Sequence, residues 1–187
     1  MGHSQAQKAE TRRRVLALAS QHIRTEGLPA LAIGRLMESA GLTHGGFYGH
    51  FNSREALVEA ALEQALADGE AAALKAASGA PKAASVVRGY LSKAHRDNPA
   101  VGCAIASLVT DVARLEAPAR AIMMRKMERY VSQIAEAAEG ASEDAAWAAW
   151  STMLGAIQLA RLFVDDPRSD KILSAGRKAA LAILEND

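Results

Sequence analysis

Apolar residues recur along most of this chain at intervals of three and four positions, the spacing that gathers them on one face of an α-helix. The pattern starts at Lys8 and first breaks at Gly27 and Pro29, two residue types common at the end of a helix. No stretch of useful length alternates apolar and polar residues as a strand would. The pattern therefore predicts an all-α fold of about nine helices.

The later breaks also coincide with glycine, proline and capping residues. Gly41 is suited to end the second helix and Thr43 to cap the third. Asn52 is suited to open the fourth, with Glu55 three residues later in the capping arrangement. The run Ser78-Gly79-Ala80-Pro81 would end that helix. After the first helix, the expected helices span residues 33–40, 44–51, 52–77, 82–97, 101–114, 118–139, 142–163 and 168–185.

The composition agrees with a helical fold. The 187 residues include 42 alanines, and alanine is the residue that most favours a helix. Half of the residues are apolar, which provides for a sizeable core. The single cysteine excludes an internal disulfide. No apolar run reaches the ~18 residues of a membrane span, and the start lacks a signal-peptide core, so we expect a cytoplasmic protein.

Charge is distributed unevenly along the chain. The net charge is only +1, but residues 1–54 carry seven Lys and Arg against three Asp and Glu, together with four of the five histidines. The remainder is close to neutral. A basic N-terminal region is compatible with an anionic partner such as DNA. Solvated basic faces are common, so charge alone does not decide the matter, and the side chains of Lys8, Arg12, Arg13 and Arg14 fit either interpretation.

Two short helices joined by Ala40-Gly41-Leu42-Thr43 form a candidate helix-turn-helix in this basic region. The second, residues 44–51, contains three glycines that each cost roughly 1 kcal/mol relative to alanine. Phe47 and Phe51 are spaced to anchor it to the core. Glycine allows close approach of another large molecule, and the face opposite the phenylalanines offers polar groups suited to DNA.

These features resemble the DNA-binding domain of the tetracycline-repressor (TetR) family of bacterial transcription regulators, over residues 12–60. The resemblance is carried by Arg14-Val15-Leu16, Gly27, Leu36, Ala40-Gly41-Leu42-Thr43, Gly46-Phe47-Tyr48-Gly49-His50-Phe51 and Arg54-Glu55-Ala56-Leu57. It implies a helix-turn-helix domain over residues 8–54 and an effector-binding and dimerisation domain over residues 55–187. The partners it implies are double-stranded operator DNA, a small-molecule effector and a second copy of the chain.

The resemblance also implies roles for individual residues. Residues 43–50 would enter the major groove, and Tyr48, His50 and Arg54 would grip phosphates. One departure is the stretch Leu31-Ala32-Ile33, where the family commonly has a capping Ser or Thr; Arg35 is placed to supply that phosphate contact instead. The expected DNA-binding residues are Arg35, Thr43, His44, Gly45, Gly46, Tyr48, His50 and Arg54.

The effector is expected in a mostly apolar cavity of the helical body. Gly102-Cys103 falls in the first turn of an expected helix, a position that lowers the pKa of a thiol. Some members of the resembled family use such a cysteine to sense oxidants or electrophiles, although a small buried apolar residue is the favoured interpretation of Cys103. His95 has no second ligand at helical spacing, so we expect it at the surface or pocket edge rather than on a metal. The expected pocket residues are Tyr90, Cys103, Ile105, Met123, Met127, Trp147 and Trp150.

Small and apolar residues on the last two expected helices predict the interface of a two-fold dimer. The residues expected there are Met153, Ala156, Leu159, Ala160, Ile172 and Ile183, with Ala149, Thr152, Leu173, Ala180 and Leu184 on the same faces.

The favoured function is a ligand-responsive DNA-binding transcriptional regulator, usually a repressor in the family, acting on a palindromic operator. The alternative is a helical small-molecule carrier or interaction module without DNA binding. The glycine-rich segment favours the regulator, because a carrier has no need of a costly exposed helix. The chain has no phosphate loop, dinucleotide fingerprint or HExxH motif, so no enzyme, cofactor or metal site is expected.

Overall fold

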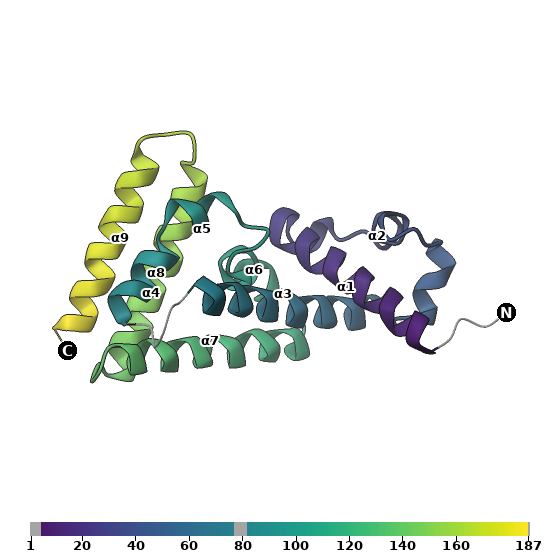
Figure 1. Ribbon diagram of the computed structural model, residues 1–187, viewed down its shortest axis with the longest axis horizontal. Helices are drawn as coiled ribbons and strands as arrows, with labels where there is room; N and C mark the ends of the chain where they lie inside the picture. Colours follow the sequence, from purple (N-terminus) through teal and green to yellow (C-terminus); the bar gives the residue numbers. More distant parts are fainter. Residues whose placement is uncertain (1–4, 77–81, 187) are drawn as a thin grey trace.

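All regular structure in the described residues, 5–76 and 82–186, is helical in the computed structural model (Figure 1). The prediction of an all-α fold is confirmed. None of the described helices is both long and apolar enough to cross a membrane. The elements are α1 (Gln5–Glu26), η1 (Leu28–Ala30), α2 (Ile33–Ser39), η2 (His44–Gly49), α3 (Arg54–Ala76), α4 (Ala83–Tyr90), α5 (Lys93–Asp97), α6 (Ala104–Val112), α7 (Ala117–Ala137), α8 (Glu143–Leu162) and α9 (Arg168–Glu185), where η marks a 3-10 helix.

The helices divide into a head and a body that share one long helix. The head holds α1, α2 and η2 near the N-terminus, and α8 and α9 lie side by side at the opposite end of the molecule (Figure 1). Helix α3 packs against α1 at one end and against α7 and α6 in the body. The head is therefore joined to the body through a continuous helix.

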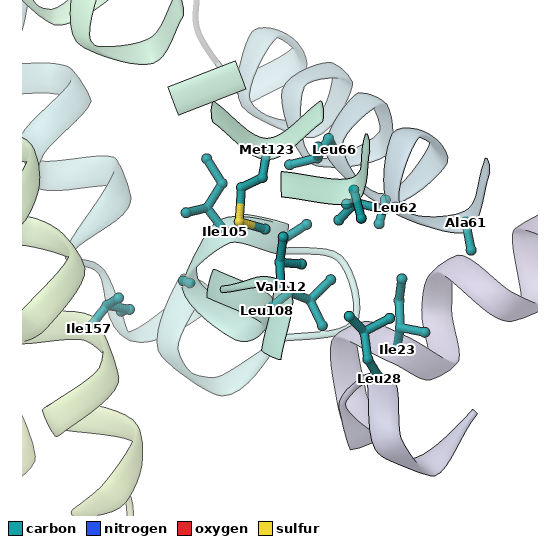
Figure 2. Packing of buried hydrophobic residues seen from close by; sticks show 14 of the residues in the cluster. Ile23, Leu28, Ala61, Leu62, Leu66, Ile105, Leu108, Val112, Met123 and Ile157 are labelled. Carbon is teal, nitrogen blue, oxygen red and sulfur yellow. The ribbon is translucent and has the colours of Figure 1, made fainter. Parts of the chain in front are cut away.

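One hydrophobic core runs through both parts. Its centre is α6, whose Ile105, Leu108 and Val112 are buried. Figure 2 shows these residues between Met123 of α7 and Leu28, which follows α1 at the edge of the head. Helix α6 thus contacts the head and the body at once.

The predicted helix stops in the head are confirmed in detail. Helix α1 ends before Gly27, and α2 ends at Ser39, with Ala40 as its C-cap and then Gly41, which has a positive φ of 70°. The Gly41 N–H donates to the Glu38 carbonyl and the Leu42 N–H donates to the Met37 carbonyl, both at 2.8 Å. This pair of bonds is the Schellman motif, which glycine favours because it adopts the left-handed conformation without strain.

Three details differ from the prediction. The expected helix 82–97 is two helices, because Leu91 leaves the helical conformation and the Ser92 hydroxyl accepts a hydrogen bond from the His95 N–H to start α5. The expected helix 44–51 is a 3-10 helix. The cap of α3 is Ser53, whose hydroxyl accepts from the Ala56 N–H at 3.1 Å, and not Asn52. The predicted break at residues 78–81 lies outside the described residues.

Candidate nucleic-acid interface and effector site

The segment η2 is anchored by two phenylalanines. Phe47 and Phe51 are 1% and 3% exposed, and their rings stack with centroids 5.6 Å apart. Their burial turns the rest of the segment outward, so Tyr48 is 70% exposed although its ring edge touches Phe47. An exposed tyrosine on a firmly anchored segment presents its hydroxyl to a partner at little cost in ordering.

The glycines of η2 have no explanation inside the chain. At Gly45 and Gly49 an added Cβ would meet no atom within 4 Å, and neither residue has the positive φ that favours glycine. Gly41, one turn earlier, does need its positive φ. Because glycine weakens a helix, its presence at two open positions fits a surface that must stay flat for a partner.

Two arginines of α1 hold the helix-turn-helix in place. Arg14 donates to the Ala40 carbonyl at the end of α2, at 2.7 Å, and the Arg12 guanidinium lies over the Phe51 ring, 5.0 Å from its centroid. Arg13 instead pairs with Glu10 on the surface of α1. The sequence did not decide whether Lys8, Arg12, Arg13 and Arg14 face solvent or contact DNA. Of these four, Arg12 and Arg14 contact residues of the helix-turn-helix.

The expected DNA-binding residues lie on η2 and its flanking residues, in the first turn of α2 and at the start of α3. Thr43, at the N-cap of η2, makes no capping bond with its side chain. Arg35 donates to the Ala30 carbonyl at 3.2 Å, and Arg54 is the first residue of α3. Helix α2 begins after Ala32 without a side-chain cap, as its missing hydroxyl predicts. The exposed members are Arg35, Thr43, His44, Gly45, Tyr48 and Arg54, and the half-buried members are Gly46 and His50.

Two carboxylates connect the head with the helices behind it, and the sequence analysis missed both. Asp111 of α6 accepts a hydrogen bond from the Leu28 N–H at 2.9 Å. Asp68 of α3 accepts from the Ser20 hydroxyl at 2.8 Å and from Arg24 at 3.3 Å. Because each acceptor is distant from its donor in the sequence, no local sequence pattern predicts these hydrogen bonds. These bonds fix how the head sits on α3 and α6.

In the body, three aromatic rings and one imidazole pack edge to face. The Trp150 ring contacts Tyr90 and Tyr130, with centroids 5.1 and 5.6 Å away, and Tyr90 also contacts His95 at 4.6 Å. The geometry suits aromatic pairs, whose edges carry partial positive charge and whose faces carry partial negative charge. We call Tyr90, His95, Tyr130 and Trp150, with Cys103 beside them, the aromatic cluster.

His95 ties this cluster to the start of α6. Its Nε2 accepts a hydrogen bond from the Cys103 N–H at 3.0 Å, so Nδ1 carries the proton and donates to the Tyr90 carbonyl at 2.6 Å. Burial lowers the pKa of His95, in agreement with a neutral ring. The fit is close, because a Cβ on Gly102 would lie 2.6 Å from His95 Cδ2. His95 therefore has a positioning role in the cluster.

The direction of the pKa shift of Cys103 agrees with the favoured interpretation as a packing residue and not with the alternative of an activated thiol. Cys103 is the N-cap of α6, and the backbone N–H groups of Ala106 and Ile105 do act to lower its pKa. Burial outweighs them and raises the pKa of the thiol above its ordinary value. The helix N-terminus is present as predicted, but the surroundings reverse its effect.

The remaining expected pocket residues are packed in the hydrophobic core or against it. Ile105 and Met123 are buried in the core, and Met127 is half-buried on α7. Trp147 is half-buried, with its indole N–H 3.4 Å from Glu143. Two hollows of the described residues lie elsewhere, a cleft of about 390 Å³ between α1 and α2 and one of about 320 Å³ between α7 and α8.

Most residues expected at a dimer interface are packed within the chain. Met153, Ala156 and Ala160 are buried between α8 and its neighbours, and a Cβ on Gly176 would lie 2.6 Å from that of Ala156. Leu159 is exposed, while Ile172 and Ile183 are half-buried. Of the others, Ala149, Leu173, Ala180 and Leu184 are buried and Thr152 is half-buried. The apolar surface open to a partner is therefore narrower than the predicted set.

Comparison with known proteins agrees with this architecture. A family model described as bacterial regulatory proteins, tetR family, matches residues 15–61. No curated protein matches the chain. A TetR transcriptional regulator from Chloroflexus aurantiacus superposes with a TM-score of 0.79 at 21% identity, over 95% of each chain. The reduced form of Escherichia coli NemR gives 0.73 at 21% identity, over 91% of this chain and 95% of that one. A TetR-family transcriptional regulator from Streptomyces coelicolor gives 0.68 at 20% identity, over 95% and 96%.

A helix-turn-helix head joined through one long helix to an all-helical body defines a helix-turn-helix transcription regulator fold. Residues 15–61 match the family model of the bacterial regulatory proteins of the tetR family, and the chain as a whole has the fold of solved TetR-family transcriptional regulators. The resemblance inferred from the sequence is confirmed.

Proposed function

We propose that the protein is a DNA-binding transcriptional repressor that binds a palindromic operator as a homodimer and is released by a small molecule or by a redox or electrophile signal. The observation that carries the proposal is the outward face of η2. Its open glycines and exposed Tyr48 stand on a segment held from behind by Phe47 and Phe51. Such a face suits close contact with the major groove.

The residues of this face divide by the chemistry they offer. Tyr48, His50, Arg54 and Arg35 donate hydrogen bonds or positive charge to phosphates, which positions the protein without reading sequence. Thr43, His44, Gly45 and Gly46 lie at the start of η2, nearest the base edges. The site is one of binding, with no catalytic role assigned to any residue.

Gly45→Leu tests this assignment. A Cβ at this exposed position meets no atom of the chain within 4 Å, so we expect the variant to fold with the rest of the leucine side chain between η2 and the groove. We expect loss of electrophoretic shift with an operator obtained by oligonucleotide selection, and an unchanged circular dichroism spectrum. Gly89→Leu is the matched control, because an added Cβ at Gly89 also meets nothing and the residue lies on α4. Operator binding by Gly45→Leu equal to that of the parent would contradict the groove assignment.

The homodimer is assigned to the outer face of α8 and α9. Leu159 and Leu162 are 52% and 77% exposed, one turn apart, and they continue a row of small residues. That row comprises Ala148, Thr152 and Gly155 on α8 and Ala175, Ala179 and Ala182 on α9. An apolar row of this kind on two neighbouring helices suits a self-complementary four-helix contact.

Light scattering at low micromolar concentration tests this dimer. We expect twice the mass of one chain for the parent and the mass of one chain for Leu159→Glu with Leu162→Glu, because four buried carboxylates would face each other across the axis. Met124→Glu changes an equally exposed apolar residue on α7 and should leave the dimer intact. A parent protein of single-chain mass would remove the assignment.

The release signal is assigned to the body. Helix α6 starts at the aromatic cluster, where Cys103 is its N-cap, and carries Asp111, which holds Leu28 of the head. A ligand or a modification at the cluster that shifts α6 therefore acts on the head, in a shift between two populations. Oxidants or alkylating agents that act through Cys103 should release operator DNA from the parent and not from Cys103→Ser. An equal response in both would leave Cys103 a packing residue.

A further inference from the structure

The aromatic cluster contains two buried hydrogen-bond donors without a partner. Trp150 is 3% exposed, and its indole Nε1 makes no hydrogen bond. The Tyr90 hydroxyl is buried as well and has no partner at full hydrogen-bond geometry. Its contact is with the thiol of Cys103, a weak hydrogen-bonding group that raises the pKa of the phenol further. Buried donors are nearly always satisfied in folded proteins, so two in one cluster require an explanation.

The two donors belong to rings that are in edge-to-face contact. The rings that carry them have centroids 5.1 Å apart, and the Tyr130 ring packs on the other edge of Trp150. A ligand between these rings meets aromatic surface, which favours a flat conjugated molecule.

The ionisable groups around the Tyr90 hydroxyl favour a ligand that accepts hydrogen bonds. The ionisable groups that act on the Tyr90 phenol are Cys103, Arg161 and Tyr130, none of them a carboxylate. The Arg161 guanidinium is held nearby through bonds to the carbonyls of His95 and Arg96. An indole N–H can only donate, so the ligand must supply an oxygen with lone pairs.

The Tyr90 ring lies at the end of a helix. Tyr90 is the last residue of α4, and Leu91 after it leaves the helical conformation with φ −92° and ψ 43°. The Tyr90 carbonyl accepts a hydrogen bond from His95 Nδ1 and the Leu91 carbonyl accepts one from Arg177, so this helix end is held at two points.

We infer that Tyr90 and Trp150 form the polar part of a binding site for a planar conjugated molecule whose carbonyl or carboxylate oxygen accepts hydrogen bonds from Tyr90 Oη and Trp150 Nε1. This inference names the ligand class for the effector site of the proposed function and rests on that proposal for its regulatory consequence. Binding itself does not involve DNA, so it is measured on the protein alone.

The test uses the indole N–H resonances of the two tryptophans. In protein labelled with ¹⁵N at tryptophan, Trp147→Phe removes one indole signal and so assigns that of Trp150. Acetophenone is the probe, and ethylbenzene is its match in shape without an acceptor oxygen. We expect acetophenone to shift the Trp150 indole proton resonance downfield, as a new hydrogen bond does. We expect ethylbenzene to leave this resonance unshifted.

Two tyrosine variants separate the hydroxyl from the ring. Tyr90→Phe should weaken acetophenone binding about tenfold, the factor for one hydrogen bond of ordinary strength. Tyr130→Phe removes a hydroxyl from the same cluster that is not among the buried unpartnered atoms, and it should change the affinity by less than a factor of about two. An unchanged Trp147 indole resonance in both variants shows that they are folded.

Three results would overturn the inference. They are a Trp150 resonance that acetophenone does not move, an equal affinity in Tyr90→Phe, and a water molecule that stays bound to the Trp150 N–H at saturating probe. Operator binding is scored separately on the same samples. Binding of acetophenone by a protein that does not bind operator DNA would remove the proposed function and leave the ligand site standing.

Discussion

The head and the body both contain residues that the chain's own packing does not explain, but of opposite kinds. In the head, Gly45 and Gly49 have empty space where a side chain would fit. In the body, Tyr90 and Trp150 have buried polar atoms with no partner. Empty space at a surface suits a large partner that approaches from outside, whereas unpaired donors in an interior suit a small molecule that enters. The contrast distinguishes the proposed DNA surface from the proposed effector site.

The largest expected effect tests whether anchoring in the head is what sets up its surface. Phe47→Ala removes a ring that is almost fully buried and should lower the free energy of unfolding by roughly 3–5 kcal/mol. Chemical denaturation measures this. Phe163→Ala, a half-buried ring after α8, is the control and should cost clearly less. Equal losses would mean that Phe47 is not a principal anchor.

The next effect tests the link between the two regions. Asp111→Ala leaves the buried Leu28 N–H without its acceptor and should cost about 1–3 kcal/mol of stability. Asp111→Asn keeps an acceptor oxygen at the same place and should lose less. If the bond also transmits the signal, Asp111→Ala should bind operator DNA with a weakened response to effector, measured by fluorescence anisotropy. A stability of Asp111→Ala equal to that of the parent would show that the link contributes nothing.

A specificity measurement sharpens the picture of the head. His44 is exposed at the first position of η2. If it reads a base, His44→Ala should lose roughly 1–3 kcal/mol of discrimination at one base pair of each half-site, with the other positions unchanged. Competition among operator variants measures it. A uniform loss across all variants would make His44 a phosphate contact.

The smallest expected effect concerns the phosphate contacts. Arg54→Ala should flatten the slope of log K against log salt concentration by about 1 per half-site, because one fewer counterion is released. Lys82→Ala removes an exposed cation before α4, outside the head, and should leave the slope as it is. An equal salt dependence in the parent, Arg54→Ala and Lys82→Ala would show that Arg54 does not contact a DNA phosphate.

The head was predictable nearly residue by residue, because its determinants are local. The spacing of Phe47 and Phe51 predicts their burial, and Gly41 predicts the end of α2. The exceptions are also local in origin. Asn52 and Ser53 are neighbours of similar capping strength, and the backbone conformation decides between them.

The body was predictable only as a set of helices. Tyr90, Cys103 and Trp150 meet as expected, but the signal for this was residue type alone, which placed Ile105 and Met123 in the same pocket. The reversed pKa of Cys103 depends on burial by distant segments. The predicted dimer face includes residues that are buried within the chain, because the sequence does not show which small residues pack α8 against α9.

The continuity of α3 bears on how such proteins can be recombined. A junction between head and body at residues 54 and 55 would cut at the first turn of α3, but Leu57, Val58 and Leu62 are buried and this part of the helix packs on α1. A head transplanted without these residues would lose the apolar surface of α3 on which α1 packs. A chimaera that gives this head a new sensor should therefore keep the helix through Asp68, which binds Ser20, and change identity beyond it.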